Sequence, residues 1–141
     1  MREQYETFIN NLMNSIENLV DETNQPLFKE VEFGGKPASV DRLPGCYIIP
    51  QPIRCVNVTP NVVEWRFPVV IQVTSLGSYV SKDTFMSTLG LVDRIIKMIE
   101  SDITIGGSVD HVEIDVIEPV VYAERVDFMI QIVGVTQVQE V

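Results

Sequence analysis

The feature that most constrains the fold is a long run of alternating apolar and polar residues between Val62 and Thr74. The odd positions are apolar without a break, namely Val63, Trp65, Phe67, Val69, Ile71 and Val73. This period of two is typical of a strand with one buried face. At roughly 3.3 Å per residue the strand would span about 36 Å, longer than most strands in a domain of this size. The chain therefore needs a sheet, and the odd face, Trp65 included, is expected to lie in the core.

Two segments with helical periodicity lie on either side of this run. From Gln4 to Val20 apolar residues recur every three or four positions, and a second stripe of this kind extends to about Ser101. Ser81 or Asp83 is expected to cap the second helix. Each segment predicts a helix with one apolar face, and we expect that face to pack on the sheet.

Four further strands or strand pieces are expected, two before the long run and two after the second helix. A short strand is predicted from Leu27 to Phe33, and the run from Cys46 to Val58 is strand-like but contains two prolines. Because proline lacks the N–H that donates to a ladder, part of this run must bulge or lie at a sheet edge. In the closing strands we expect Val112, Ile114, Val116, Val126, Phe128, Ile130 and Ile132 to face inward, with His111, Glu113, Asp115, Arg125, Asp127, Met129 and Gln131 facing outward.

The predicted order is α-β-β-β-α-β-β. Because the strands cluster instead of alternating with helices, the order favours an α+β fold, with an antiparallel or mixed β-sheet and helices packed on it. The 141 residues match a single domain, residues 1–141. Val62, Val70 and Met129 are apolar residues on otherwise polar strand faces. Two interpretations stay open for them: one helix covers each side of the sheet, or a neighbouring subunit covers its outer surface.

Residues 34–46, GGKPASVDRLPGC, form a predicted loop that contains three of the eight glycines and two of the eight prolines. We expect this loop to be exposed and to hold contacts with a partner.

The net charge of -10 is unevenly distributed along the chain. Residues 102–141 contain one Lys or Arg against eight Asp or Glu. Nucleic-acid binding by phosphate neutralisation needs a cluster of basic residues, and the sequence has none. Acidic surface of this kind either keeps the protein in solution or repels DNA that passes nearby. The apolar runs are too short to cross a bilayer, and the N-terminal segment lacks the pattern of a secretory signal, so we expect the protein to stay in the cytosol without membrane contact.

No catalytic constellation is recognisable in the sequence. It has one histidine, His111, which is expected at a strand surface, and it has no nucleophile elbow or phosphate loop. Cys46 and Cys55 lack metal-site spacing and are expected to be reduced and packed. Glu113 and Asp115 would point the same way from one strand, either as a solvated face or as a carboxylate pair for a cation or a substrate. We expect no enzyme activity, no cofactor and no metal.

Five segments in this order resemble the tail terminator, or tail-completion, proteins of long-tailed bacterial and archaeal viruses. They are a leading helix, MREQYETFINNLMNSIENLV, a glycine-rich loop, FGGKPASVDRLPG, a long strand, VVEWRFPVVIQVTS, a second helix, DTFMSTLGLVDRIIKMIESD, and a closing hairpin. The resemblance covers nearly the whole chain and lies in length and element order. It includes no shared motif residue.

The resemblance implies a virion structural protein in the neck region of the tail, assembled in the host cytoplasm. Copies would form a ring, typically a hexamer, that caps the tail tube and joins it to the head connector. The implied partners are other copies of the chain, the tail tube protein and a head-completion or connector protein, and DNA would pass through the lumen without specific binding. Candidate interface or lumen residues, chosen from exposure and loop position, are Gly34, Gly35, Lys36, Asp41, Arg42, Glu113, Asp115, Arg125, Asp127 and Met129. The alternatives are another head-completion, neck or tail-tube component, and a small acidic domain that binds a ligand or acts as an enzyme.

Overall fold

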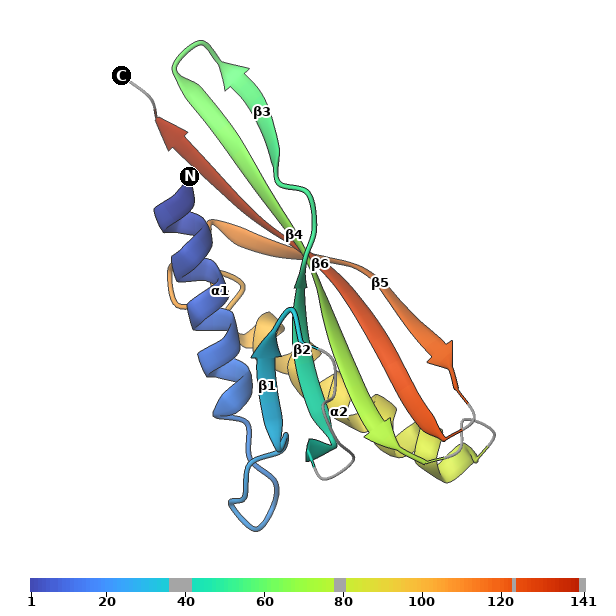
Figure 1. Cartoon of the computed structure of the whole chain (residues 1–141). Helices are drawn as coiled ribbons and strands as arrows, with labels where there is room; N and C mark the ends of the chain where they lie inside the picture. Colours follow the sequence, from blue (N-terminus) through green and yellow to red (C-terminus); the bar gives the residue numbers. More distant parts are fainter. Residues whose placement is uncertain (36–41, 78–80, 123, 140–141) are drawn as a thin grey trace.

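The computed structural model describes residues 1–35, 42–77, 81–122 and 124–139 (Figure 1). In chain order the elements are α1 (Arg2–Glu17), β1 (Glu30–Phe33), β2 (Gly45–Pro50), β3 (Arg54–Thr59), β4 (Val62–Leu76), α2 (Lys82–Ser101), β5 (His111–Val121) and β6 (Arg125–Gln139). The α+β class with a mixed sheet is confirmed. The predicted long strand is β4, which extends over 15 residues.

The sheet is built around the pairing of β4 with β6, which run antiparallel along their whole lengths. The strand order is β1-β2-β4-β6-β5, and β3 also pairs with β4. Only β1 and β2 are parallel to each other, and every other pair is antiparallel. On one edge β4 therefore has two successive partners: β3 along its first residues, Val62–Arg66, and β2 along Val69–Thr74.

These two partners correct the predicted order, because residues 46–58 form two strands instead of one interrupted strand. β2 ends at Pro50, opposite Val69, and β3 begins at Arg54, opposite Arg66. The residues between them include Pro52, which has no N–H to give to a ladder, so pairing stops there and restarts further along β4. The observed order is α-β-β-β-β-α-β-β. The expectation that part of this run lies at an edge is confirmed by β3.

Both helices pack on the same face of the sheet. The ring of Phe8 in α1 stacks on Phe67 of β4 at a centroid distance of 6.2 Å, and Phe85 of α2 meets Phe128 of β6 edge-on at 5.1 Å. Phe128 pairs with Val73, which shares the odd face of β4 with Phe67. The core between helices and sheet contains Phe8, Ile9, Leu12, Ile16, Phe67, Val69, Ile71, Val73, Val92, Ile95, Ile99, Phe128, Ile130 and Ile132. The interpretation with one helix on each side of the sheet is therefore wrong.

Three details differ from, or refine, the predicted elements. Trp65 is only partly buried against the core, although Val63, further out on the same face of β4, is buried. The helix α1 ends at Glu17, three residues before the predicted Val20. The predicted cap of α2 is confirmed, since Ser81 Oγ accepts a hydrogen bond from the Thr84 N–H at 3.4 Å.

Candidate interaction surface

The face of the sheet opposite the two helices is here called the open face. It consists of the even positions of β4 and the odd positions of β6. The residues of β2, β3 and β5 that pair with these positions lie on the same face. Its two ends differ. Around Thr74 the face is buried, and around Glu64 it is accessible.

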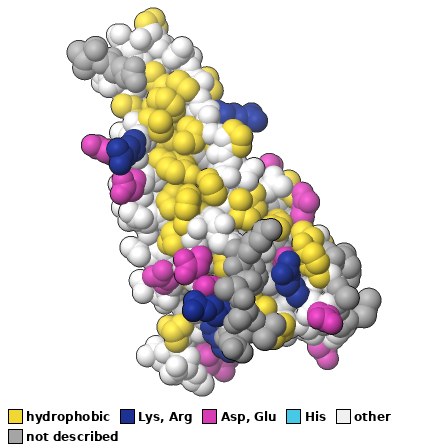
Figure 2. All heavy atoms as spheres, viewed as in Figure 1, with side chains coloured by type: hydrophobic (Ala, Val, Ile, Leu, Met, Phe, Trp, Pro, Cys, Tyr) yellow, Lys and Arg dark blue, Asp and Glu magenta, His cyan; other side chains and the backbone are white. Residues whose placement is uncertain are grey.

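The accessible end belongs to a projecting arm, defined as β3 with Val62–Arg66 of β4 and Val135–Gln139 of β6. In Figure 1 the arm extends beyond the bundled part of the molecule at the top of the view. All six residues of β3 are exposed, and the side chains of Val56 and Val58 are 45% and 49% exposed. Figure 2 shows a stripe of hydrophobic side chains along this upper part of the surface. Within the described ranges, the outer edge of β3 has no strand beside it.

An arm of this kind is unusual on a protein that functions alone. The outer edge of β3 presents backbone N–H and C=O groups that a further strand can pair with, and apolar side chains lie beside them. Natural proteins usually protect such edges with charged side chains, prolines or a covering segment. Here β3 contains one charged residue, Arg54.

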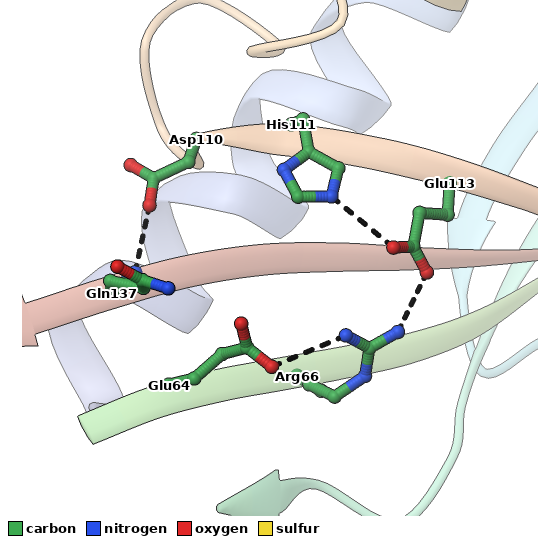
Figure 3. Close-up of polar contacts among 6 residues, drawn as sticks. All are labelled: Glu64, Arg66, Asp110, His111, Glu113 and Gln137. Atoms are coloured by element: carbon green, nitrogen blue, oxygen red, sulfur yellow. Dashed lines mark hydrogen bonds and ion pairs between the residues drawn. The ribbon is translucent and has the colours of Figure 1, made fainter. Parts of the chain in front are cut away.

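A network of charged side chains crosses the open face at the base of the arm and includes the arm residues Glu64 and Arg66 (Figure 3). Arg66 of β4 contacts Glu64 at 3.3 Å and reaches over β6 to Glu113 of β5 at 2.6 Å. His111 lies 3.3 Å from the other carboxylate oxygen of Glu113. The hydrogen bonds from His111 and Arg66 lower the pKa of Glu113. These contacts join side chains of β4 and β5 across β6, and the position of His111 at a strand surface is confirmed.

The predicted carboxylate pair of Glu113 and Asp115 does not form part of a cation site among the described residues. A β-bulge interrupts β5 here: Ile114 pairs with Ile132 and Val116 pairs with Gln131, which leaves Asp115 without an opposite residue. The bulge also turns Val116 onto the open face, so the prediction that Val116 faces inward is wrong. No group of His, Cys, Asp and Glu that could hold a metal ion occurs in the part of the chain that the structure describes.

Asp127 is buried, which corrects its prediction as an outward residue. Its Oδ2 accepts a hydrogen bond from Gln72 Nε2 at 3.2 Å, and Arg125 Nε lies 3.2 Å from its Oδ1. The Arg125 guanidinium is 4.2 Å from the centre of the Tyr122 ring. Burial raises the pKa of Asp127, and hydrogen bonding by Thr74 and the charge of Arg125 oppose that rise. Asp127 is therefore a structural residue and does not contact solvent or a lumen.

Met129 and Arg125 remain on the open face as predicted. Met129 is half-buried between Gln72 of β4 and Glu118 of β5, its register partners. Arg125 has a side chain one-third exposed. Both lie at the end of the face away from the arm.

The loop candidates are only partly described. Lys36 and Asp41 lie outside the described residues. Gly34 has a φ of 68°, the left-handed region that favours glycine, and its N–H donates to Ile48 O at 2.6 Å. Gly35 follows it beside β1. Arg42 forms an ion pair with Glu30 of β1 at 3.1 Å, so its side chain is held against its own subunit.

The two cysteines lie in different environments. Cys46 is buried in β2, and burial raises the pKa of its thiol. Cys55 is exposed on β3, so the prediction that both thiols are packed is wrong for Cys55. Their register partners, Val73 and Trp65, are eight residues apart on β4, which corresponds to about 26 Å. A disulfide within one chain is therefore excluded in this fold.

A hollow of about 340 Å³ opens on the open face where β2 gives way to β3. Arg54, Arg66 and Asp115 line it together with Gln51, Pro52, Pro68, Val69, Val70, Gln131 and Val133. The lining has charged groups of both signs, the guanidinium groups of Arg54 and Arg66 and the carboxylate of Asp115, and could contact a polar protein segment.

Neither of the helices that the structure describes is long and apolar enough to span a membrane. The chain matches no protein-family model and no curated protein.

Proposed function

We propose that this chain is a virion structural protein of the tail terminator type. Copies would form a ring, typically six in the family that the sequence resembles, that caps the tail tube and joins it to the head connector. The observation that supports this most directly is the projecting arm, with an exposed apolar edge strand, β3, that has no described partner within the chain. An edge of this kind favours assembly with other protein chains.

The charge of the open face fits the same role. Of the acidic residues in β5, Glu113, Asp115 and Glu118 are exposed. Arg66 is paired with Glu113, so in a ring whose open faces line the lumen Asp115 and Glu118 would supply the negative charge that repels the phosphates of passing DNA. The proposal therefore includes DNA as a passenger and excludes specific DNA binding.

Electron microscopy of the purified protein, alone and mixed with tubes polymerised from the tail tube protein, tests this function. We expect rings on grids, or density at the ends of tubes, and tubes that stop lengthening once the protein is added. Tubes with heat-unfolded protein serve as the control. A protein that stays monomeric at every concentration and leaves tube growth unchanged would contradict the proposal.

A further inference from the structure

We propose that copies of this chain join head to tail through their sheets, with β3 of one copy adding to the outer edge of β5 in the next. The inference rests on the proposed function, since it specifies the contact that would build the ring. The partner that binds the arm is thus a second copy of the chain.

The two strands are free edges on opposite sides of one sheet. β3 flanks β4 on one side, and β5 flanks β6 on the other. Within the described ranges neither outer edge has a strand beside it. A contact between two different surfaces of the same molecule is heterologous, and such contacts produce rings when the rotation between copies closes.

The strand directions suit this contact. β3 is antiparallel to β4, β4 to β6, and β6 to β5, so β3 and β5 run in opposite directions within one copy. When copies are related by rotation about an axis roughly along the strands, β3 of one copy meets β5 of the next in antiparallel orientation. This is the pairing that dominates the sheet within each copy.

The two edges are offset along the sheet. Val56 of β3 lies opposite Glu64, whereas Val116 of β5 lies opposite Gln131, which pairs with Val70. Six residues along β4 correspond to about 20 Å. Copies in a closed ring cannot shift along its axis, so this offset would instead tilt the strands against the axis, as strands tilt when a sheet closes on itself.

The side chains on the open-face side of the two edges are complementary. Arg54 is the one charged residue of β3, and no ion pair joins it to another described side chain. On β5, Glu118 is exposed and forms no ion pair with the residues that the structure describes, whereas Asp115 lines the same hollow as Arg54 of its own copy. The apolar neighbours also correspond, because Val56 is 45% exposed on β3 and Val116 is 37% exposed on β5.

On the helix side an apolar groove lies beside the edge of β5. Met86, Leu89 and Ile96 of α2 line this groove together with Ile117, whose side chain is 41% exposed. Cys55 points to the helix side of β3, because its register partner is Trp65 on the odd face of β4. A strand added to β5 would cover this groove and bring Cys55 over it.

Cys55 provides a direct test of the contact by cross-linking. Ile114→Cys and Ile117→Cys each place a thiol on the helix side of β5, and Val116→Cys, on the opposite side, is the matched control. Each variant is oxidised both alone and with tail tubes, and the products are separated on a non-reducing gel. We expect Ile114→Cys or Ile117→Cys to form a ladder of covalent multimers that Val116→Cys and the unchanged chain do not form.

Two outcomes would overturn the inference. Rings that form normally while neither Ile114→Cys nor Ile117→Cys cross-links would show that copies meet elsewhere, and the proposed function would stand. Efficient dimer formation by the unchanged chain through Cys55 alone would show that two β3 strands pair with each other. Absence of both rings and tube capping would instead contradict the proposed function itself.

A charge exchange gives a second, independent test. Arg54→Glu should raise the concentration needed for ring formation about tenfold, because like charges would then face each other across the contact. Adding Glu118→Arg to the same chain should restore assembly, because Glu118 does not line the hollow that holds Arg54 in its own copy. Both sites are exposed, so circular dichroism should show an unchanged fold. Rings that form equally well with Arg54→Glu alone would count against the pairing of β3 with β5.

Discussion

The contact between Gly134 of β6 and Phe8 of α1 allows a quantitative prediction about how the first helix is seated. A Cβ atom added at Gly134 would lie 2.8 Å from Phe8 Cζ, and two further ring atoms would be 3.0 and 3.1 Å away. The Phe8 ring cannot swing into solvent, because it is fully buried and stacks on Phe67. Gly134→Ala should therefore push α1 away from the sheet.

Two opposing effects set the size of this change. Overpacking of a filled core typically costs about 1–3 kcal/mol, whereas replacing glycine by alanine inside a strand contributes about 0.5–1 kcal/mol of stability. At mid-range the overpacking term, about 2 kcal/mol, exceeds the gain of about 0.75 kcal/mol, so Gly134→Ala should lower the free energy of unfolding by about 1 kcal/mol. Phe8→Leu removes the ring atoms that the new methyl group meets. In the double variant, Gly134→Ala with Phe8→Leu, the clash should disappear, and the stability that alanine contributes over glycine inside a strand should remain.

Urea denaturation of the four proteins of this double-mutant cycle, followed by circular dichroism, measures these effects. We expect the two substitutions to be non-additive by about 1 kcal/mol or more, with the double variant more stable than the sum of the single changes predicts. Gly134→Ala with unchanged or increased stability would refute the close seating of Phe8 on β6. Additive effects would refute the contact between the two side chains.

Three further predictions concern single side chains. Burial raises the pKa of Asp127 in the folded state above its unfolded value of about 3.9. The stability that protonated Asp127 contributes is therefore fully present below the unfolded pKa and is lost as the pH rises through the folded pKa. Asp127→Asn should therefore gain stability relative to the unchanged chain between pH 4 and pH 7 in urea titrations at both pH values, and a relative loss would contradict the direction of the shift. Under native conditions a thiol reagent should label Cys55 but not Cys46, and urea should expose both; two labelled thiols in the folded protein would be inconsistent with a buried Cys46. Ser81→Ala should cost about 1 kcal/mol by removing the bond to the Thr84 N–H, with Ser81→Asp as the control that keeps the cap, and equal stability of the two variants would show that the bond has no effect.

The strands and helices could be predicted from the sequence wherever one side of an element faces the core. The odd face of β4 from Phe67 to Val73 is buried as its alternation predicts, because a strand covered on one side places every second side chain inside. Trp65 follows the same alternation but is only partly buried, whereas Val63, two residues further out on the same face, is buried. Periodicity alone shows which side of a strand is apolar, but it does not show how fully each side chain on that side is covered.

The bulge in β5 and the burial of Asp127 could not be predicted for a different reason. An extra residue at Asp115 reverses the inside–outside alternation that follows it, and no residue in the sequence around it is a turn or bulge signal. Asp127 is buried because Gln72, Thr74 and Arg125 surround it from neighbouring strands, and such contacts depend on register. The surface of β3 was only partly predictable: two prolines placed it at an edge, but its separate pairing with β4 was not foreseen.

The unprotected edge of β3 also bears on how the protein behaves before it meets a partner. The exposed backbone groups beside Val56 and Val58 favour association between free chains when they collide. The net charge of -10 opposes this association, because it makes the chains repel one another. At about 0.1 M ionic strength such repulsion is screened beyond about 10 Å. Salt concentration therefore controls the rate of association. In dilute buffer repulsion keeps the free chains apart, and added salt shortens the time before they associate.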